Sequence, residues 1–496
     1  MNENKKLLHN RGICVVIPTY NNSGTIVDVV QRTLCECDDV IVVCDGCTDD
    51  TLQLLEAVEG ITLVAYEKNA GKGHALKVGF QKAIELGFSF AITLDGDGQH
   101  FPEDIPSFLR ANRRHPDAII VGKRKFAEDC DRSFGSRFAN GFSNFWFAVE
   151  TGRYLRDTQT GYRLYPLKRL SGLWCLTSGY EAELELLVFA SWAGVPLVSE
   201  SIDVYYPPRE ERVSHFRGFR DFGRISLLNT VLCFLAVVYG YPRRLLRFGL
   251  RLLRTVYSLL FFLIMMVAVT PCVALYMSIG GKTDEKRFRV HQLLQYLSRV
   301  VLKIHGIPGV RYSEVNRGGE CFDRPAVIIC NHQSHLDVLA LLVQSPKIVV
   351  LTKEWVWKNV FYGYLIRCAE FLPVYDGIEG VLPRLRELVE RGYSIAVYPE
   401  GSRSEDCSIS RFHQGAFHLA EMLGLDIVPM VLYGAGYVLP KRGWLLNRGV
   451  IRVEIDGRIS AAELRELGSS TRAQASAMRK YYKRRYEEVE ESIIKS

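Results

Sequence analysis

Apolar and polar positions divide the chain into three parts. Residues 1–224 and 285–496 show short apolar runs that alternate with helical periodicity, and polar motifs directly follow the runs. This alternation predicts parallel sheets covered by helices. Residues 225–284 differ, because two uncharged runs, 225–241 and 256–279, flank an Arg-rich stretch. We therefore expect two α/β domains joined by a hydrophobic, Arg-rich segment that associates with a membrane.

Within the first part, four short runs of β-forming residues predict strands, and two periodic stretches predict helices. The strands are expected at 13–17, 40–43, 63–66 and 91–94, and the helices at 25–34 and 73–86. In parallel sheets, ligands bind at the carboxyl ends of the strands. Those ends carry residues 18–20 (PTY), 45–46 (DG) and 95–97 (DGD), so a binding site is expected there.

Residues 95–100 (DGDGQH) hold two carboxylates one residue apart, with glycines that permit a tight turn. Mg²⁺ and Mn²⁺ prefer such oxygen ligands, and a divalent ion there would neutralise a diphosphate leaving group. A surface turn rich in Asp and Gly is the alternative interpretation. Residues 68–74 (KNAGKGH) precede a predicted helix and suit a phosphate at its N-terminus, although Gly-rich turns before helices are common.

Together these motifs resemble glycosyltransferase family 2, and most resemble its polyprenyl- or dolichol-phosphate mannose synthase branch. The likeness covers about residues 11–222, and its ordered motifs are 18–21 (PTYN), 45–49 (DGCTD), 69–73 (NAGKG), 95–100, 122–124 (GKR) with Arg137, and 157–163 (DTQTGYR). The resemblance implies a GT-A, Rossmann-like fold and a metal-dependent transfer with inversion at the anomeric carbon.

The same resemblance assigns roles to individual residues. It implies nucleotide-sugar binding by Pro18, Tyr20, Asp45, Lys72 and Asp95; metal binding by Asp95, Asp97 and Gln99; acceptor binding by Arg124, Arg137 and Gln159; and a catalytic position for Asp157. A lipid phosphate acceptor needs arginines, whereas a hydroxyl acceptor needs a carboxylate base. The two arginines favour a lipid phosphate. Cys44 stands where the family has an acidic residue, which leaves the nucleotide open.

In the last part, a predicted strand at 327–329 runs into residues 330–337 (CNHQSHLD). A turn there can fold the carboxylate of Asp337 back onto the imidazole of His332, which could then act as a general base on a substrate hydroxyl. The alternative is an Asp at a helix start beside a hydrogen-bonded His. A second strand, 394–398, precedes residues 399–404 (PEGSRS), where Arg403 can hold an anion through two hydrogen bonds.

These motifs resemble the glycerol-3-phosphate and lysophosphatidic acid acyltransferase family over about residues 327–432. The resemblance implies that His332 is the general base, that Asp337 orients it, and that Glu400, Gly401 and Arg403 bind the acceptor. It also implies an acyl-CoA or acyl carrier protein donor and no cofactor for this half. Asp376 stands where the family usually has an Arg, and a carboxylate there would repel a phosphate. A lipid hydroxyl without that phosphate is therefore favoured.

Composition favours a globular protein rather than a disordered one, with 48% hydrophobic and 24% charged residues. The net charge is +7, and basic residues gather around the central segment. Next to apolar runs they indicate an anionic membrane surface rather than nucleic acid, and a solvated basic face is the alternative. The 13 cysteines show no framework spacing, and residues 1–12 show no signal peptide. We expect reduced thiols, no zinc, and a location on the cytoplasmic face of the cell (inner) membrane.

The central segment is open to three topologies. Residues 256–279 are long enough to cross a bilayer core of about 30 Å. A single span would separate the two halves, and two spans would place the central arginines outside, against the positive-inside rule. Because Pro242 and Pro271 interrupt the runs, we favour an interfacial or re-entrant dock, with two spans as the alternative. Residues 461–494 predict a helix packed on the second domain.

The sequence therefore predicts a bifunctional membrane enzyme. One half would transfer a sugar from a nucleotide-sugar to a lipid acceptor, and the other would transfer an acyl chain to a lipid hydroxyl. Two alternatives remain. The chain could be a phospholipid-type 1-acyl-glycerol-3-phosphate acyltransferase with an accessory glycosyltransferase domain, or one half could be a non-catalytic docking module.

Overall fold

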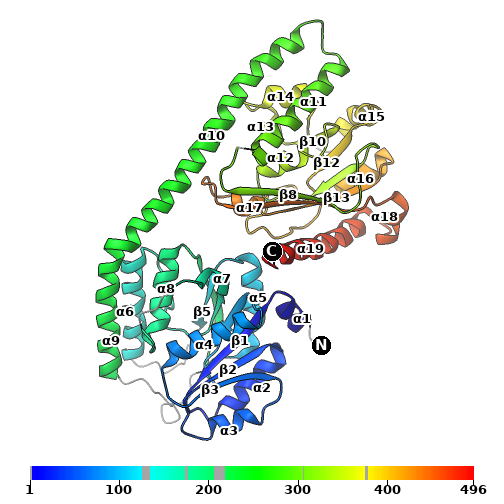
Figure 1. The fold of residues 1–496 in the computed structure, drawn as a ribbon. Helices are drawn as coiled ribbons and strands as arrows, with labels where there is room; N and C mark the ends of the chain where they lie inside the picture. Colours follow the sequence, from blue (N-terminus) through cyan, green and yellow to red (C-terminus); the bar gives the residue numbers. More distant parts are fainter. Residues whose placement is uncertain are drawn as a thin grey trace. The chain divides into compact units, whose positions relative to one another are not determined.

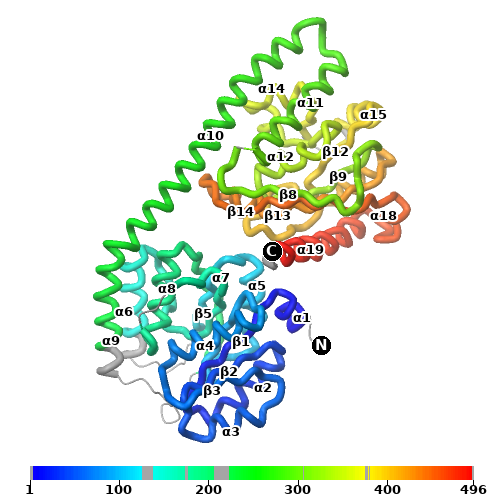
Figure 2. Tube along the Cα trace, viewed as in Figure 1, coloured from blue at the N-terminus to red at the C-terminus, as the bar shows by residue number. Residues whose placement is uncertain are grey.

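The computed structural model describes residues 3–125, 134–173, 177–205, 218–304, 306–374 and 378–495, and the remainder is grey in Figure 2. The chain divides into two compact units, Met1–Arg247 and Phe248–Ser496. Each unit contains one β-sheet and its helices. The predicted fold class is confirmed: two α/β domains follow one another, with a long apolar helix in the middle of the chain.

The first unit alternates strands and helices up to its last helices (Figure 1). Its elements are α1 (Glu3–Asn10), β1 (Ile13–Thr19), α2 (Ile26–Glu36), β2 (Val40–Asp45), α3 (Thr51–Glu56), β3 (Ile61–Tyr66), α4 (Lys72–Glu85), β4 (Phe90–Thr93), η1 (Pro102–Asp104), α5 (Ile105–Arg114), β5 (Ile119–Lys125), α6 (Phe134–Thr151), β6 (Arg163–Pro166), α7 (Leu167–Leu170), α8 (Glu181–Ala193), β7 (Leu197–Asp203), α9 (Gly218–Leu235) and the π-helical turn η3 (Ala236–Gly240).

The first sheet has the order β3-β2-β1-β4-β6-β5-β7. Strands β1 to β4 are parallel, as predicted, whereas β6 runs antiparallel to both of its neighbours. Every residue of β1, β2 and β4 is buried, which explains why these strands read as continuous apolar runs rather than alternating ones. The carboxyl ends of β1, β2 and β4 therefore lie side by side at one edge of the sheet.

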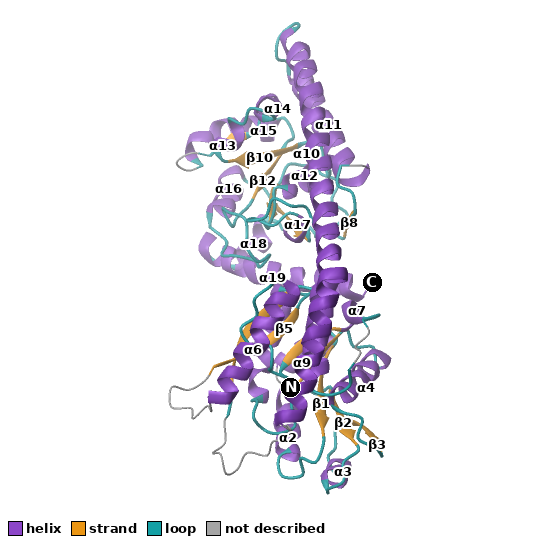
Figure 3. Cartoon of the chain, turned by 90° about the vertical axis from the view of Figure 1, so that its left-hand side faces the viewer, coloured by secondary structure: helices purple, strands orange, loops and turns teal. Residues whose placement is uncertain are grey.

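Helices α6, α8 and α9 pack together beside this sheet (Figure 1), and α6 and α9 can also be seen in Figure 3. Their shared core includes Phe147, Leu187, Trp192 and Leu232. Glu150 of α6 is fully buried near this core, and within the described part of the chain neither of its carboxylate oxygens has a hydrogen-bond partner. Burial alone raises the pKa of Glu150 to about 8. The carboxyl group is therefore neutral in the folded protein at neutral pH.

This burial predicts a pH-dependent cost to stability. In the unfolded chain Glu150 ionises near its ordinary pKa of 4.5, so the folded state loses stability as the pH rises from about 4.5 to about 8. Glu150→Gln should raise the free energy of unfolding by up to about 4 kcal/mol near pH 8 and have little effect near pH 5. Urea unfolding at the two pH values measures this, with the exposed Glu56→Gln as the control. An equal gain at both pH values would contradict the assignment.

The second unit begins within the long helix α10 (Tyr241–Ser278), inside which the unit boundary falls. Its further elements are α11 (Asp284–Arg299), η4 (Val300–Ile304), β8 (Val310–Asn316), β9 (Val327–Cys330), α12 (Leu336–Leu342), β10 (Ile348–Thr352), α13 (Glu354–Trp357), α14 (Gly363–Cys368), β11 (Leu372–Pro373), η5 (Glu379–Val381), α15 (Leu382–Glu390), β12 (Ser394–Val397), α16 (Gly415–Leu423), β13 (Ile427–Tyr433), α17 (Ala435–Val438), β14 (Gly449–Ile455), α18 (Ala461–Leu467) and α19 (Thr471–Lys495).

The second sheet has the order β11-β10-β12-β9-β13-β14-β8. The strands from β11 to β13 are parallel, and β14 is antiparallel to β13. Because β9 and β12 are neighbours, the two motifs that follow them in the sequence meet at one edge. The C-terminal stretch packs on this unit, as predicted, with Met478, Tyr482 and Val489 in its core. It forms two helices rather than one, because residues 468–470 (GSS) separate α18 from α19.

The central segment is a single continuous helix rather than two interrupted runs. Backbone helical structure extends from Gly218 through α9, η3 and α10 to Ser278, so the breaks expected at Pro242 and Pro271 are wrong. Pro242 lies two residues after the end of the wide turn η3, whose π-type spacing relieves the clash between the proline ring and the preceding carbonyls. Pro271 removes one backbone donor inside α10, but the helix continues on both sides of it.

Two arginines of α10 bind the first unit. Arg244 donates to the carbonyl of Thr151 at the end of α6, at 2.7 Å, and Arg247 donates to the carbonyl of Trp192 near the end of α8. Helix C-termini expose unpaired carbonyls and carry partial negative charge, so both contacts are stabilising. These two arginines therefore have a structural role in this domain, in addition to any contact with lipid headgroups.

Candidate active sites

The first candidate site lies at the carboxyl ends of β1, β2 and β4. Pro18 lies in β1 and is buried, Tyr20 follows that strand, and Asp45 ends β2. The Asp45 carboxylate accepts hydrogen bonds from the backbone N–H groups of Ala70 and Gly71, at 2.8 and 2.9 Å. The Gly-rich segment before α4 is thus fixed to the end of β2 by Asp45.

Lys72, the first residue of α4, bridges two carboxylates. Its Nζ lies 2.7 Å from Oδ1 of Asp95 and 2.9 Å from Oε2 of Glu183 on α8. Burial disfavours the ammonium form, but the two carboxylates outweigh it and raise the pKa of Lys72. A Cβ atom on Gly161 would lie within 2.8 Å of this pair, so only glycine fits there. The 157–163 motif therefore closes directly over the Lys72–Asp95 pair.

Asp97 and Gln99 follow Asp95 in the same turn. The backbone N–H of Gln99 donates to Oδ1 of Asp97 at 3.0 Å. Burial and the nearby charge of Asp95 raise the pKa of Asp97 to about 6. Burial is the larger cause and the charge of Asp95 adds to it, so the ionised form of Asp97 lacks a positive partner of the kind that Lys72 provides for Asp95. A divalent cation would supply that charge, so the residues present fit the predicted ion.

Among the described residues, no group of three His, Cys, Asp or Glu side chains forms a closed metal site. Mg²⁺ and similar ions are commonly held by one or two carboxylates together with substrate phosphates. Asp95 and Asp97 would contribute the protein oxygens.

The predicted acceptor residues form an ion pair. The guanidinium of Arg124 binds the carboxylate of Asp157 through two hydrogen bonds, Nε to Oδ2 at 2.8 Å and Nη2 to Oδ1 at 2.9 Å. Both side chains are largely buried. Gln159 is exposed beside them. Arg137 lies in α6, but its side chain is outside the described part of the structure.

Three buried polar residues of this site were not predicted from the sequence. Glu183 holds Lys72, and fully buried Arg163 donates to the carbonyls of Thr158 and Glu183, both at 2.8 Å. Burial lowers the pKa of His100 to about 4, and neither ring nitrogen has a partner among the residues that the structure describes. The acidic residues at 181, 183 and 185 alternate in an otherwise apolar helix. This pattern could have indicated Glu183, because a buried carboxylate needs a positively charged or hydrogen-bonding partner.

The second candidate site contains the predicted His–Asp pair. Nδ1 of His332 lies 2.9 Å from Oδ2 of Asp337, which also accepts from the backbone N–H groups of Gln333 and Ser334. With Nδ1–H donating to Asp337, Nε2 of His332 remains free to accept a proton. The imidazole stacks on the ring of Tyr398, with centroids 4.2 Å apart. This is the geometry of a general base oriented by a carboxylate.

The 399–404 loop forms hydrogen bonds with both the backbone N–H and the backbone carbonyl of His332. One carboxylate oxygen of Glu400 accepts from the N–H of His332 at 2.8 Å, and the other accepts from the N–H of Ser410 at 2.9 Å. The N–H of Ser404 donates to the carbonyl of His332 at 2.8 Å. Burial raises the pKa of Glu400. Both carboxylate oxygens of Glu400 are thus engaged with this chain's own backbone.

Arg403 remains available for a substrate anion. Within residues 378–495 and the other described ranges, its guanidinium makes no hydrogen bond or ion pair. It lies close enough to His335 for its charge to add to burial in lowering the pKa of that imidazole. Gly401 lies in the turn between Glu400 and Arg403. Asp376, predicted to disfavour a phosphate, lies outside the described residues.

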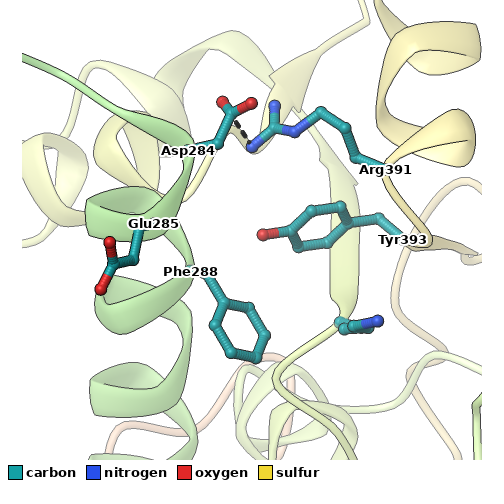
Figure 4. Close-up of a pocket in the computed structure, with 6 residues that line it drawn as sticks. Asp284, Glu285, Phe288, Arg391 and Tyr393 are labelled. Atoms are coloured by element: carbon teal, nitrogen blue, oxygen red, sulfur yellow. Dashed lines mark ion pairs between the residues drawn. The ribbon is translucent and has the colours of Figure 1, made fainter.

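A separate cavity of about 310 Å³ lies at the opposite edge of the second sheet (Figure 4). Lys347 and Tyr393 precede β10 and β12, whereas His332 and Glu400 follow β9 and β12. Arg391 forms an ion pair with Asp284 across this cavity, at 3.0 Å. The cavity is therefore distinct from the His–Asp site.

The fold and the two sites define the chain as a fusion of two transferase domains. Residues 14–167 match the family described as Glycosyl transferase family 2, and residues 303–433 match the family described as Acyltransferase. The first unit thus contains a family 2 glycosyltransferase domain, and the second contains a domain of the acyltransferase family. Both predicted family resemblances are confirmed.

Relatives match one half of the chain each. A chloroplastic 1-acyl-sn-glycerol-3-phosphate acyltransferase of Arabidopsis thaliana is 32% identical over 156 residues, which cover 30% of this chain and 44% of that protein. A UDP-N-acetylglucosamine–dolichyl-phosphate N-acetylglucosaminyltransferase of Methanococcus voltae is 28% identical over 239 residues, 44% of this chain and 95% of that protein. The chain spans less than half the length of the plant acyltransferases that it matches.

Among solved structures, a 1-acyl-sn-glycerophosphate acyltransferase from Thermotoga maritima is similar to this chain with a TM-score of 0.41 and 20% identity. The likeness covers 48% of this chain and 97% of that protein.

Proposed function

We propose that the chain is a bifunctional enzyme of membrane lipid modification. The first domain would transfer a sugar from a nucleotide-sugar to a lipid phosphate, and the second would transfer an acyl chain from a thioester of coenzyme A or acyl carrier protein to a lipid hydroxyl. The observation that supports this proposal is the presence of two separate clusters of polar residues, one at the strand ends of each sheet. One is the Lys72–Asp95–Asp97 cluster and the other is the His332–Asp337 pair.

In the first domain, the residues bind and orient rather than form a covalent intermediate. A bound divalent ion, held by Asp95 and Asp97, would neutralise the diphosphate leaving group. Lys72 keeps Asp95 ionised and aligned, and Gly161 leaves room above this pair. A lipid phosphate is already an anion and needs no base. Arg124 can bind it by exchanging one of its two hydrogen bonds to Asp157 for a phosphate oxygen.

In the second domain, Nε2 of His332 would take the proton of the acceptor hydroxyl as that oxygen attacks the thioester carbonyl. Asp337 holds the other ring nitrogen and stabilises the imidazolium that forms. The proton then passes to the departing thiolate. Arg403 would hold an anionic group of the lipid or of the acyl donor, because it is unpaired among the described residues and close to this site.

Glu400 acts in this proposal by positioning His332, because its oxygens are occupied by backbone N–H groups. Glu400→Ala should therefore lower kcat by about a hundredfold, while KM for the lipid acceptor changes little. Arg403→Ala should instead raise the acceptor KM. Steady-state kinetics with varied acceptor separate the two effects. A variant of Glu400 that raises KM and preserves kcat would show that this carboxylate contacts the acceptor.

Membrane association is the third part of the proposal. Among the described residues, one helix, Gly223–Ser278, is long and apolar enough to cross a membrane, and only 17% of its most apolar stretch is buried. Its 56 residues extend about 84 Å, far more than a bilayer core of about 30 Å. Leu227 and Phe234, two exposed apolar residues seven positions apart in this helix, and exposed Phe145 of α6 add to its apolar surface. These features support association with a membrane, and we place the contact on its cytoplasmic surface because both proposed donors are cytosolic.

This apolar face predicts a measurable effect on vesicle binding. The double variant Leu227→Glu with Phe234→Glu should lower partitioning into anionic vesicles by at least about tenfold, since it places two charges in the headgroup region. Ile84→Glu, at another exposed apolar position in the same domain, is the matched control. Flotation of the full chain measures the partitioning. Equal loss in both variants would argue against a specific face.

One incubation tests the two activities together. Purified full-length protein is mixed with labelled nucleotide-sugars, labelled acyl thioesters and a membrane lipid extract, and the labelled lipids are separated. The proposal expects both labels in lipid products. Acyl label alone, with lysophosphatidic acid as the preferred acceptor, would instead support a phospholipid-type acyltransferase with an accessory domain.

A further inference from the structure

Two cysteines flank Asp45 in the turn that follows β2. Cys44 is the penultimate residue of that strand and is buried, and Cys47 is partly exposed two residues after Asp45. Both are free thiols. The spacing, Cys-x-x-Cys, places a second sulfur close enough for a disulfide without a long loop closure. Neither residue has a role in the proposed transfer chemistry.

The turn folds the second sulfur back toward the first. Sγ of Cys47 donates to the carbonyl of Thr19 at 3.7 Å, and Thr19 is the residue of β1 that pairs with Cys44 in the sheet. The N–H of Gly46 also bonds to the carbonyl of Cys44, which tightens the turn. Sγ of Cys47 therefore lies against the strand residue that is next to Cys44 in the sheet. Interaction with the Cys47 thiol lowers the pKa of Cys44 to about 7, and the same interaction together with burial raises the pKa of Cys47.

This turn is tightly coupled to the nucleotide side of the site. Gly46 has a φ of +64°, and a Cβ atom there would lie 2.2 Å from the backbone nitrogen of Asn69. Asp45 holds the N–H groups of Ala70 and Gly71 in the same segment. Any movement of the turn is therefore passed to the segment that precedes α4 and to Lys72.

We propose that Cys44 and Cys47 form a reversible disulfide by exchange with a small-molecule disulfide, and that this bond weakens binding of a nucleoside diphosphate at the first site. A disulfide holds its two sulfurs about 2.0 Å apart, which is closer than two non-bonded thiols can approach. Because the turn packs on residues 69–71, the shift moves Asp45 away from its two N–H partners. The binding effect rests on the proposed glycosyltransferase function, whereas disulfide formation does not.

The exchange is balanced with oxidised glutathione as the oxidant. The shared proton of the pair moves to Cys44, and the more accessible Sγ of Cys47 attacks one glutathione sulfur, so that the glutathione S–S bond breaks and one glutathione thiolate leaves. The Cys44 thiolate then attacks the sulfur of Cys47 and expels the second. Two cysteine sulfurs are oxidised and one glutathione disulfide is reduced. The two glutathione thiolates take up two protons, one that the pair shared and one that it released to solvent when it ionised.

The test uses the full-length chain, exposed to oxidised or reduced glutathione. Differential alkylation with fragment mass spectrometry locates the disulfide, and calorimetry with UDP and Mn²⁺, repeated with GDP, measures binding. We expect a Cys44–Cys47 bond and binding about tenfold weaker after oxidation, with recovery on reduction. Cys47→Ser and Cys47→Ala should bind the nucleotide like the reduced protein in both conditions. Cys35→Ser, at an exposed cysteine elsewhere, should remain as sensitive as the parent chain.

Three results would overturn the proposal: thiols at both positions under excess oxidant, equal nucleotide binding before and after oxidation, or sensitivity retained in both Cys47 variants. A different result is expected if the proposed sugar-transfer function is itself wrong. If the reduced protein binds neither UDP nor GDP, the sugar-transfer assignment and the binding effect both fall, and the alkylation result still decides whether the disulfide forms.

Discussion

His332→Ala should abolish acyl transfer and leave sugar transfer intact. Loss of a general base lowers the rate by about a thousandfold or more, equivalent to about 4 kcal/mol of transition-state stabilisation. The imidazole is the group with a free nitrogen at the carboxyl end of β9, and its other nitrogen is held by Asp337. Because the two sites lie in separate units, the loss should be confined to the labelled acyl product. Incorporation of acyl and sugar labels, measured in the same reaction, gives both rates.

Two further variants test whether the loss is specific to His332 and whether it depends on Asp337. His418→Ala removes an exposed imidazole from the same domain and should keep the acyl rate of the parent chain. Asp337→Asn keeps the shape but presents an amide to the N–H groups of Gln333 and Ser334, so it should lower both activity and stability. Acyl transfer that survives His332→Ala would remove the assignment of this residue and favour a non-catalytic second domain.

Asp97→Ala should remove sugar transfer by about a thousandfold or more, with acyl transfer unchanged. Burial, together with the charge of Asp95 two residues away, raises the pKa of Asp97, and a bound cation would offset both effects. Removing one carboxylate leaves the diphosphate leaving group without its counter-charge. Calorimetry should show Mn²⁺ binding in the presence of UDP for the parent chain and none for the variant. Asp38→Ala, at an exposed carboxylate, is the control.

The metal readout separates two explanations for a loss of sugar transfer. A variant that binds Mn²⁺ normally but does not transfer sugar would place Asp97 at the acceptor rather than at the ion. A parent chain that transfers sugar equally well in excess chelator would contradict the requirement for a divalent ion.

Much of the fold could be predicted from the sequence, because strands that are buried on both faces appear as continuous apolar runs. The runs at 13–17, 40–43, 327–329 and 394–398 all became strands within a residue or two of their expected bounds. The continuity of the central helix was not predicted, because a proline inside a helix usually interrupts it. Pro242 follows a π-type turn, and such a turn cannot be recognised from apolar periodicity.

The candidate sites were predicted in part, for a physical reason. Motifs that follow strands, such as Asp95 and His332, lie where the sheet topology places them. Contacts made across the sequence were not visible: Glu183 reaches Lys72 from a helix more than a hundred residues away, and Glu400 turns toward the backbone of His332 rather than toward solvent. The residue types were correct, but their partners depend on tertiary packing.

The arginines that close the ends of α6 and α8 bear on how the two halves can be separated. Arg244 and Arg247 belong to the first compact unit, which ends at Arg247, whereas the hydrophobic pattern divides the chain at residue 224. The end of the unit therefore lies inside a helix rather than in a loop. From Gly218 to Ser278 the backbone offers no extended segment to a protease, since cleavage requires the chain to open. Independent expression of the glycosyltransferase half should therefore succeed only when its C-terminus includes Arg247. The acyltransferase half, expressed alone, would begin within α10, a helix that starts in the first unit.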